Sequence, residues 1–539
     1  MKAKIEKIAR EKDLFRMDGD GMIRVPILLK GVLRAPAQMS RAEAERAFSA
    51  QGADGTWARA GGNLVLREPV YHRASLERSG AFAYTVLPDF RPEEVIEADP
   101  VAVLAERLAP MPFSGVVEWL DGVRKALDKA AGFVDAVRRD TAGMSEHPDM
   151  WHDGGFAAFP FLLDSEAARK MVDRELSSWG IPGTGLLEGW QPLPEPAPAA
   201  DPAPLMAAAL FPDEPFFRET RAPKIRAFPT RQLHITAGNA PQVPLISLLR
   251  AVLTKSAAVL KAPFGAVVPA ALLGMAAAVA LPDHPITKSL SIVYWPGGEP
   301  SYEDALLSPG SFDRIVVWGA PEAVESVKKK ALYTKVLAFT PRYGVSFLGR
   351  EALQNLETAA ARAATDSLVA NQKACIASQI HYVEGSMEEA ASYAEALKKA
   401  LSAFDAAAPN LILPAVRGNL KRLMRGLFVN ARWFINERDG FFTSGAVLPD
   451  GEFPLSALTM SRLVMVRAVP DLTLALKYLH PGVSTVGVYP PERLEIMADS
   501  IAARGVSNVV DLGRAGSGFG GQPHDGMMVL SELVDWKNR

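Results

Sequence analysis

The sequence lacks several features, and each absence excludes a class of protein. It has one cysteine in 539 residues, so no intramolecular disulfide framework can form. Its formal net charge is −2, which implies no overall attraction to nucleic acid or to an anionic membrane. The longest apolar run, residues 265–281, contains Pro269 and Gly274, so it favours a buried helix over a membrane span. No apolar core follows the charged N-terminal residues, so we expect no secretory signal and a cytoplasmic protein.

The chain is too long for one hydrophobic core. Single cores stop growing at about 250–300 residues, so two or three domains are expected. The composition, 48% hydrophobic and 22% charged, is that of an ordinary soluble protein. Residues 190–204 repeat proline, which denies this segment helix and central-strand pairing and favours an extended linker. Before the linker, apolar residues at helical spacing over 114–139 predict one long helix.

After the linker, strand-like and helix-like segments alternate. Strands are expected at 234–237, 257–261, 290–294 and 314–319, and helices at 245–253, 270–280 and 302–307. Apolar strands that alternate with helices predict a parallel α/β sheet covered on both faces. In such a sheet, ligands bind beyond the carboxyl ends of the strands, so the loops there are the places to look for chemistry.

Three of these loops carry candidate residues. Gly238 permits a tight turn, and the amide of Asn239 either stabilises an oxyanion or caps the next helix. Lys261 ends a strand, where it suits a ribose hydroxyl or a phosphate, although taken alone it is more simply interpreted as a solvated lysine. Gly319 makes a turn before a helix whose free N–H groups could receive a phosphate, but the full glycine fingerprint is missing.

Two further segments attract attention. The Gly-rich loop 513–526 indicates close backbone approach to a ligand or a mobile surface loop. Residues 147–153 contain two histidines and two aspartates, but their spacing is not that of a helical metal pair. We therefore predict a solvated turn there and no metal site.

Cys375 is the only sulfur nucleophile that the chain can offer. It lies between an Ala-rich helical stretch, 351–369, and a strand at 379–383, and Ser386 caps the helix after that strand. Reactive groups are often presented at such element ends. Free cysteines, however, are usually buried small hydrophobes, and residue type alone favours that interpretation.

The order of these segments is more specific than any one of them. It is strand–Asn239, strand–Lys261, strand–Gly319, helix–Cys375–strand, and then residues 519–521 (Phe-Gly-Gly). From about residue 220 to 535 this order resembles the aldehyde dehydrogenase superfamily. Four segments resemble more closely the acyl-CoA reductases of the bacterial luminescence (LuxC) type: 235–241, 317–320, 371–375 and 523–526. Residues 1–110 match nothing that we can place.

The resemblance implies an aldehyde dehydrogenase-like α/β fold, in which a Rossmann-type cofactor domain and an α/β catalytic domain follow an N-terminal extension. We expect five segments, bounded as follows: an accessory region at 1–110, a helical segment and linker at 111–205, the NAD(P)-binding domain at 206–338, the catalytic domain at 339–510, and a Gly-rich loop with a C-terminal segment at 511–539.

The resemblance also implies roles for individual residues. Cys375 matches the nucleophile, and Asn239 matches the oxyanion donor that works with the Cys375 amide. Lys261 matches the lysine at the adenosine ribose and Gly319 the turn near the phosphates. The remaining candidates are Phe264 and Ala320 for the cofactor, and Gly521, His524 and Asp525 as support for the site.

Departures from the superfamily pattern sharpen these expectations. Ala338 stands where hydrolytic members have the Glu that activates water, so thiol exchange or hydride transfer is favoured over hydrolysis. Phe264 stands where NAD-specific members often have a Glu, so NADPH is admitted. Ala320 replaces a common Ser, and Glu452 is only a guess for the glutamate at the nicotinamide ribose.

The function that the resemblance implies is reduction of an acyl thioester, such as a long-chain fatty acyl-CoA, to the aldehyde through a cysteine thioester. The cofactor is expected to be NADPH, with NADH as the alternative. Three other functions stay open: a non-acylating aldehyde dehydrogenase, a reductase of aromatic or polycyclic acyl-CoA, and a catalytically silent binding subunit. The expected partners are an acyl-CoA or acyl-protein thioester, further copies of the chain, and acyl-supplying subunits.

Overall fold

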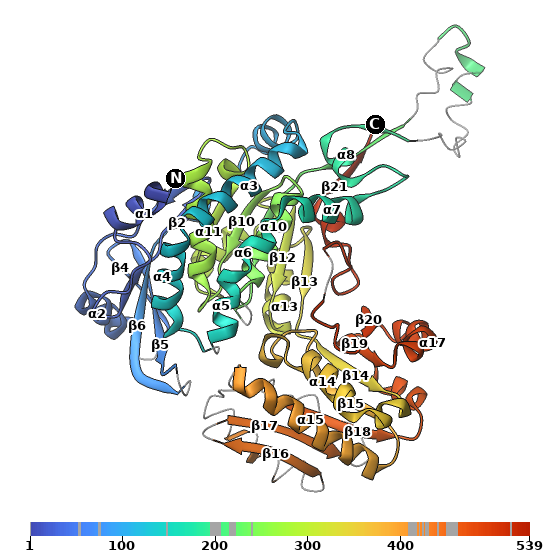
Figure 1. The fold of residues 1–539 in the computed structure, drawn as a ribbon. Coiled ribbons are helices and arrows are strands. Elements are labelled where there is room, and N and C mark those ends of the chain that lie inside the picture. The colour runs from blue at the N-terminus through green and yellow to red at the C-terminus, as the bar shows by residue number, and fades with distance from the viewer. Residues whose placement is uncertain are drawn as a thin grey trace.

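The computed structural model describes fifteen segments of the chain: 2–51, 55–73, 77–146, 149–193, 206–207, 209–214, 223–238, 241–407, 418–419, 421–422, 425, 431–438, 441–448, 462–517 and 520–539. Two seven-stranded sheets dominate these residues, and two smaller sheets accompany them. Figure 1 shows the two large sheets in different parts of the molecule, with the N-terminal elements beside the first.

The first large sheet has the order β13–β12–β9–β10–β11–β2–β3. Five of its strands run parallel: β9 (Arg231–Ile235), β10 (Ala257–Lys261), β11 (Leu290–Val293), β12 (Arg314–Trp318) and β13 (Lys335–Phe339). They are joined by α10 (Val243–Leu253), α11 (Val267–Ala280), η4 (Thr287–Ser289), α12 (Pro300–Leu306) and α13 (Pro321–Lys330). The predicted parallel α/β sheet is confirmed. Strand order reverses at β9, so the switch point where such sheets bind ligands lies between the loops after β9 and β12.

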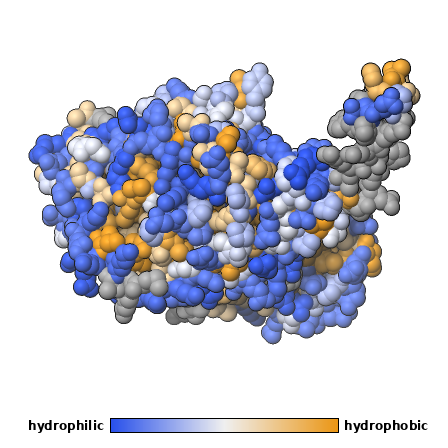
Figure 2. All heavy atoms as spheres, turned by 90° about the horizontal axis from the view of Figure 1, so that it is seen from above, coloured by the Kyte–Doolittle hydropathy of each residue, from blue (hydrophilic) through white to orange (hydrophobic). Residues whose placement is uncertain are grey.

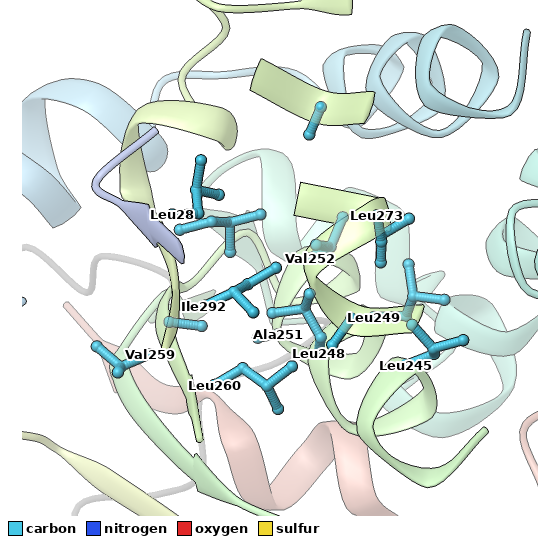
Figure 3. Close-up of a cluster of buried hydrophobic side chains, with 14 of the residues drawn as sticks. Leu28, Leu245, Leu248, Leu249, Ala251, Val252, Val259, Leu260, Leu273 and Ile292 are labelled. Carbon is cyan, nitrogen blue, oxygen red and sulfur yellow. The ribbon is translucent and has the colours of Figure 1, made fainter. Parts of the chain in front are cut away.

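The N-terminal region contributes to this sheet. It contains α1 (Lys2–Glu11), β1 (Met22–Arg24), β2 (Ile27–Leu29), β3 (Val32–Arg34), α2 (Arg41–Gln51), β4 (Trp57–Ala60), β5 (Asn63–Tyr71) and β6 (Arg78–Pro88). β2 pairs antiparallel with β11, where Leu28 lies opposite Ile292. Figure 3 shows these two side chains in one apolar cluster with side chains of α10 and α11. β3 pairs with β2 in the same sheet, and the remaining strands form a separate sheet of order β1–β6–β5–β4.

Helices occupy most of the segment from 92 to 188. They are η1 (Pro92–Glu94), η2 (Val101–Leu108), α3 (Phe113–Lys129), α4 (Ala131–Ala142), α5 (Asp149–Ala157), α6 (Phe159–Leu162), α7 (Ser165–Leu176) and α8 (Gly183–Glu188). The single helix predicted for 114–139 is therefore wrong. Ala130, with φ −101° and ψ 18°, separates α3 from α4. Apolar periodicity continues across this break, so the pattern could not reveal it.

The solvated turn predicted for 147–153 is also wrong where the structure describes it. Asp149 begins α5, and His152 is buried with its Nε2 3.0 Å from the carbonyl oxygen of Arg138. Burial lowers the pKa of His152, so this imidazole is a neutral core group. Within the described ranges, no three His, Cys, Asp or Glu side chains form a group suited to a metal ion.

The second large sheet has the order β16–β17–β18–β15–β14–β19–β20. Its strands are β14 (Tyr343–Leu348), β15 (Ser378–Glu384), β16 (Arg432–Arg438), β17 (Phe441–Leu448), β18 (Leu463–Val469), β19 (Val483–Tyr489) and β20 (Asn508–Asp511). Only β16 runs antiparallel. The intervening helices are η5 (Arg350–Gln354), α14 (Leu356–Ser367), η6 (Val369–Gln372), α15 (Met387–Ala407), η8 (Leu472–Tyr478) and α17 (Pro491–Ala502).

The C-terminal segment returns to the first half of the molecule. After α18 (Val529–Leu533), β21 (Asp535–Asn538) pairs antiparallel with β8 (Lys224–Phe228), which pairs with the short β7 (Gln191–Pro192). Pro192 thus lies on an edge strand, where a missing N–H is tolerated. Most of the Pro-rich linker, residues 194–204, lies outside the described residues.

The surface is mostly hydrophilic on the face seen from above, with apolar patches between the polar ones (Figure 2). Among the described residues, no helix is long and apolar enough to cross a membrane.

Candidate functional site

The loops after β9 and β10 lie against each other. A Cβ built on Gly238 would meet the carbonyl oxygen of Phe264 at 2.7 Å, so only glycine fits there. The hydroxyl of Thr236 also donates to the carbonyl oxygen of Lys261 at 2.8 Å. The turn predicted at Gly238 is therefore needed for close contact between two loops. Asn239, the predicted oxyanion donor, lies outside the described residues.

Lys261 ends β10 as predicted, and aromatic rings surround its ammonium group. Its Nζ lies 5.4 Å from the ring centroid of Tyr294 and 5.3 Å from that of Trp295. Burial lowers the pKa of Lys261 to about 8, and the nearby carboxylate of Glu303 only partly opposes this. A buried cation of this kind is stabilised by a ligand that supplies hydroxyl or phosphate oxygens. Phe264 is 38% exposed, which is unusual for so large an apolar ring.

Gly319 and Ala320 connect β12 to α13, as predicted. The Gly319 N–H donates to the carbonyl oxygen of Phe339 at 3.1 Å, and Ala320 offers no side-chain cap to the helix. The rings of Trp318 and Phe339 stack with centroids 4.1 Å apart. The ends of β12 and β13 thus form an aromatic floor at the switch point.

The loop that carries Cys375 has an unusual backbone. Ala370, Asn371 and Gln372 all have positive φ, at 48°, 54° and 66°. Gln372 fixes the turn through both ends of its amide, because its Nε2 donates to the Leu463 carbonyl at 2.9 Å and its Oε1 accepts from the Leu463 N–H at 3.0 Å. Such strained backbone persists only where the surroundings hold it.

Three further contacts hold this turn. Arg462, fully buried, donates from Nε to Asn371 Oδ1 at 3.0 Å. Gln379 Nε2 donates to the carbonyl oxygen of Gln372 at 2.9 Å, and the Ser484 hydroxyl donates to that of Cys375 at 2.6 Å. The cysteine therefore sits in a rigid setting, and the helix-to-strand junction predicted from the sequence is a clamped turn before β15.

Cys375 is partly buried, and opposing charges act on its thiol. Burial and, to a smaller extent, the Asp525 carboxylate raise the pKa of Cys375 to about 11. The guanidinium of Arg342 and the backbone N–H groups of Cys375 and Ile376 favour the thiolate. The thiol thus lies within electrostatic range of a negative carboxylate and a positive guanidinium that come from different parts of the chain.

The structure brings His524 and Asp525 to this place. Asp525, with a side chain only 3% exposed, lies 3.4 Å from Arg342 Nε. His524 packs against the rings of Trp318 and Phe339, and its Nδ1 accepts from Arg250 Nη2 at 3.0 Å. Burial, together with the charges of Arg250 and Arg342, lowers the pKa of His524 to about 3, so the imidazole is neutral.

Gly521 lies elsewhere. Its φ is 88°, and a Cβ there would meet the Cβ of Arg174 on α7 at 2.8 Å. The Arg174 guanidinium also donates to the carbonyl oxygen of Gly520 at 2.9 Å. Residues 520–521 of this Gly-rich loop are therefore packed on α7, whereas the N–H groups of Gly513 and Ala515 donate to the Asp366 carboxylate of α14.

Sequence reasoning missed two arginines. Arg250 is buried in the apolar α10 over the rings of Trp318 and Phe339, and its Nε and Nη1 have no hydrogen-bond partner among the described residues. A lone arginine in the run 243–253 is a signal that could have found it. Arg342 lies four residues after Ala338. Its pairing with Asp525 could not be inferred, because the two residues are far apart in the sequence.

Ala338 lies on β13 beside Val317 of β12 in the parallel register. Its methyl group therefore stands near the carboxyl edge of the first large sheet and offers no group that could act as a general base. Glu452, the guessed partner of the nicotinamide ribose, lies outside the described residues.

Comparisons with known proteins agree with this arrangement. The model of the family described as acyl-CoA reductase (LuxC) matches residues 216–536. A long-chain acyl-protein thioester reductase from Vibrio harveyi is 30% identical over 329 residues, which cover 58% of this chain and 64% of that protein. One from Photorhabdus laumondii is 29% identical over the same length and coverage. The chain thus spans a little under two thirds of the length of these relatives.

Solved structures extend the likeness to nearly the whole chain. Aldehyde dehydrogenase 21 from Physcomitrella patens superimposes with a TM-score of 0.64 at 13% identity, covering 96% of this chain and 97% of that one. Lactaldehyde dehydrogenase from Escherichia coli gives 0.63 at 16% identity, with coverage of 96% and 98%. The predicted aldehyde dehydrogenase-like fold is confirmed. With the family match over more than half of its length, the chain belongs to the LuxC family of acyl-CoA reductases.

Proposed function

We propose that this chain reduces a long-chain acyl thioester to the aldehyde with NADPH, and that Cys375 carries the acyl group. The observation that supports this most is the clamped turn before β15, which holds the chain's only thiol between Arg342 and Asp525. Membership of the reductase family supports the same reaction. The named substrates of its relatives, long-chain acyl-protein thioesters, support the acyl class.

Acyl capture begins with loss of the thiol proton, because the thiolate is the nucleophile. With a pKa of about 11, about one thiol in a thousand is ionised at pH 8, and this fraction would be smaller without Arg342 and the local N–H groups. The sulfur attacks the thioester carbonyl, the new C–S bond forms, and the donor thiol leaves with a proton. Asn239 and the Cys375 amide are proposed to stabilise the oxyanion, and loss of such a donor typically costs about 100- to 1000-fold in rate.

The residues at the switch point fit a nicotinamide dinucleotide. Gly238 and Gly319 keep the backbone free of side chains at the ends of β9 and β12, and Lys261 places a partly buried cation at the end of β10. Phe264 puts no carboxylate near a ribose phosphate, which favours NADPH over NADH. When bound, the reduced nicotinamide supplies the hydride. Cys375 then departs as a thiolate when the tetrahedral adduct collapses, so the aldehyde forms without a strong acid.

The fate of the acyl-enzyme follows from Ala338. A methyl group cannot activate water, so hydrolysis of the thioester is slow and reduction competes well. The overall balance is one acyl thioester, one NADPH and one proton giving one aldehyde, one NADP⁺ and one thiol.

The test measures NADPH oxidation and aldehyde formation with a series of acyl-CoA thioesters of increasing chain length. Wild type should form aldehyde and take up one acyl group that hydroxylamine releases. Cys375→Ala should lose both, whereas Cys375→Ser should form at most a hydroxylamine-resistant ester and no aldehyde. Undiminished turnover in Cys375→Ala would contradict the proposal. Because the chain has one cysteine, all thioester label must be at this position.

The identity of the acyl donor and the oligomeric state of the chain each require a separate experiment. The same series, repeated with an acylated protein thioester, distinguishes a coenzyme A donor from a protein donor through the ratio of kcat/KM values. The expected homo-oligomer is tested by light scattering on the intact chain.

A further inference from the structure

A cleft of about 570 Å³ opens beside the loops that follow β9 and β10. One wall is the hairpin of β5 and β6, the second is the pair of loops with Gly238 and Phe264, and the third is the segment 144–146. The volume falls within the range of small-molecule sites, about 300–1,000 Å³. Of the residues that line it, only Gly238 and Phe264 were given roles above, and the other walls have none.

Two arginines give the cleft wall a positive character. The guanidinium of Arg67 lies 4.9 Å from the ring centroids of both Phe48 and Phe82, so its plane is held by aromatic contacts. Arg78 lies beside the Tyr71 hydroxyl and is hydrogen-bonded to it. Burial raises the pKa of Tyr71, and the charge and hydrogen bond of Arg78 oppose this rise only in part. A guanidinium with a fixed plane is well suited to phosphate, which it can bind through two parallel hydrogen bonds.

The same walls offer aromatic surface. Phe82 and Phe264 line the cleft and are 39% and 38% exposed. Exposed rings at a cleft wall can stack on a planar heteroaromatic group, and such stacking is worth about 1–3 kcal/mol per base in nucleic-acid complexes. Arginine beside aromatic rings is therefore a combination that fits a nucleotide better than a simple anion or a fatty chain.

The cleft also adjoins the catalytic loop. Gly238 immediately precedes Asn239, and Phe264 follows Lys261 by three residues. On the third wall, Glu146 accepts from the Nζ of Lys373 at 3.1 Å, and Lys373 is two residues from Cys375. A ligand held in the cleft thus has its far end within reach of both the cofactor loops and the cysteine turn.

Two carboxyl groups line the cleft, Glu68 and Glu146, and a carboxylate would repel phosphate. The charge of Glu146 is paired with the ammonium group of Lys373. Glu68 is 4% exposed, and it accepts a short hydrogen bond from the Thr85 hydroxyl and a bond from the Gly265 backbone N–H. It is engaged with the β10–α11 loop, and burial disfavours its charged form. The positive side chains therefore dominate the open part of the cleft.

We propose that this cleft binds the adenosine ribose phosphate of a reaction partner, with Arg67 and Arg78 on the phosphate and Phe82 and Phe264 on the base. The inference rests on the proposed function. Two substrates of that reaction carry this chemistry: coenzyme A, with a 3′-phosphate, and NADPH, with a 2′-phosphate. An acyl-protein thioester without coenzyme A carries none.

The test compares phosphorylated ligands with their counterparts that lack the phosphate. In Arg67→Ala and Arg78→Ala, the dissociation constant of NADPH, followed by its fluorescence, and the KM for acyl-CoA are measured beside those of NADH and of the acyl-dephospho-CoA. Loss of an arginine–phosphate contact should weaken binding by about 10- to 100-fold. Arg46→Ala, an equal charge change on the exposed face of α2, should change none of these values.

The pattern of losses identifies the source of the phosphate. A loss for NADPH but not NADH assigns the cleft to the cofactor, and a loss for acyl-CoA but not acyl-dephospho-CoA assigns it to the acyl donor. Equal losses for both members of each pair, or no loss in either variant, would overturn the inference. Because Arg78 is exposed, Arg78→Ala should fold normally, so it tests phosphate binding even if Arg67→Ala folds poorly. Loss of aldehyde formation in Cys375→Ala tests the proposed function separately.

Discussion

The loops after β9 and β10 and the loop that carries Cys375 are held in different ways. At the ends of β9 and β10, neighbouring loops meet through short contacts such as Gly238 against Phe264. Before β15, three successive non-glycine residues have positive φ, each at a cost of order 1 kcal/mol. Residues 462 and 463, about ninety positions away, hold them there. The comparison indicates that the loops after β9 and β10 follow from local sequence, whereas Cys375 is positioned by the assembled fold.

The sharpest way to break this comparison is Gln372→Ala. The change leaves the N–H and C=O of Leu463 without their side-chain partner, and unpaired buried groups cost about 1–3 kcal/mol each. We expect the free energy of unfolding to fall by about 3 kcal/mol and kcat by about 100-fold, since small misplacements of a nucleophile have effects of this size. NADPH binding should not change.

The measurements are denaturant unfolding, aldehyde formation and cofactor fluorescence. Gln354→Ala, at an exposed position at the end of η5, is the matched control and should behave as wild type. If Gln372→Ala weakened NADPH binding as much as turnover, the two kinds of loop would not be independent.

Ala338→Glu tests the strand ends of the first large sheet, because Ala338 lies on β13. A carboxylate at this position restores the residue type that activates water in hydrolytic relatives, so the acyl-enzyme should break down to free acid without NADPH. General-base catalysis typically contributes about 100-fold or more, and an unoptimised carboxylate should give about tenfold. Acid release from acyl-CoA, followed by chromatography, checks this. Ala338→Gln, of equal size, should release no more acid than wild type, and a rise in both variants would refute the role of the carboxylate.

The same contrast separates what the sequence could predict from what it could not. The strands β9 to β12 and their loops were found within a few residues, because apolar runs and turn residues are local signals. β2 and β3 were missed as members of the cofactor sheet, since Lys30 bonds to Ser291, 261 positions away. The pairing of Arg342 with Asp525 was missed for the same reason, and the break at Ala130 is masked by continuous periodicity.

The charges around Cys375 can be separated by the pH dependence of alkylation. Only the thiolate reacts, so the rate with iodoacetamide should rise about tenfold per pH unit toward the thiol pKa of about 11. Asp525→Asn removes a negative charge that raises this pKa, so the rate at pH 8 should increase several-fold. Arg342→Met removes a positive charge that lowers the pKa, so the rate should decrease by a similar factor, about 3- to 10-fold.

Both rates are read by mass spectrometry on the intact chain, in which Cys375 is the only thiol. A thiol that merely fills space would respond to exposure and not to the sign of these charges. Changes of the same sign in both variants would therefore reject the electrostatic account of this site.

The smallest expected effect concerns an ion pair that joins the Cys375 loop to the segment after α4. Glu146 and Lys373 pair across the cleft with side chains 46% and 24% exposed, and ion pairs in such surroundings contribute about 0–1 kcal/mol. Glu146→Gln and Lys373→Met should each lower the free energy of unfolding by less than about 1 kcal/mol and change kcat less than about threefold. The double variant should add nothing beyond one of them, which a double-mutant cycle in 0.1 M and 1 M salt measures. A large loss of kcat in Glu146→Gln would mean that this ion pair, and not the buried clamp of Gln372 and Arg462, sets the position of the cysteine.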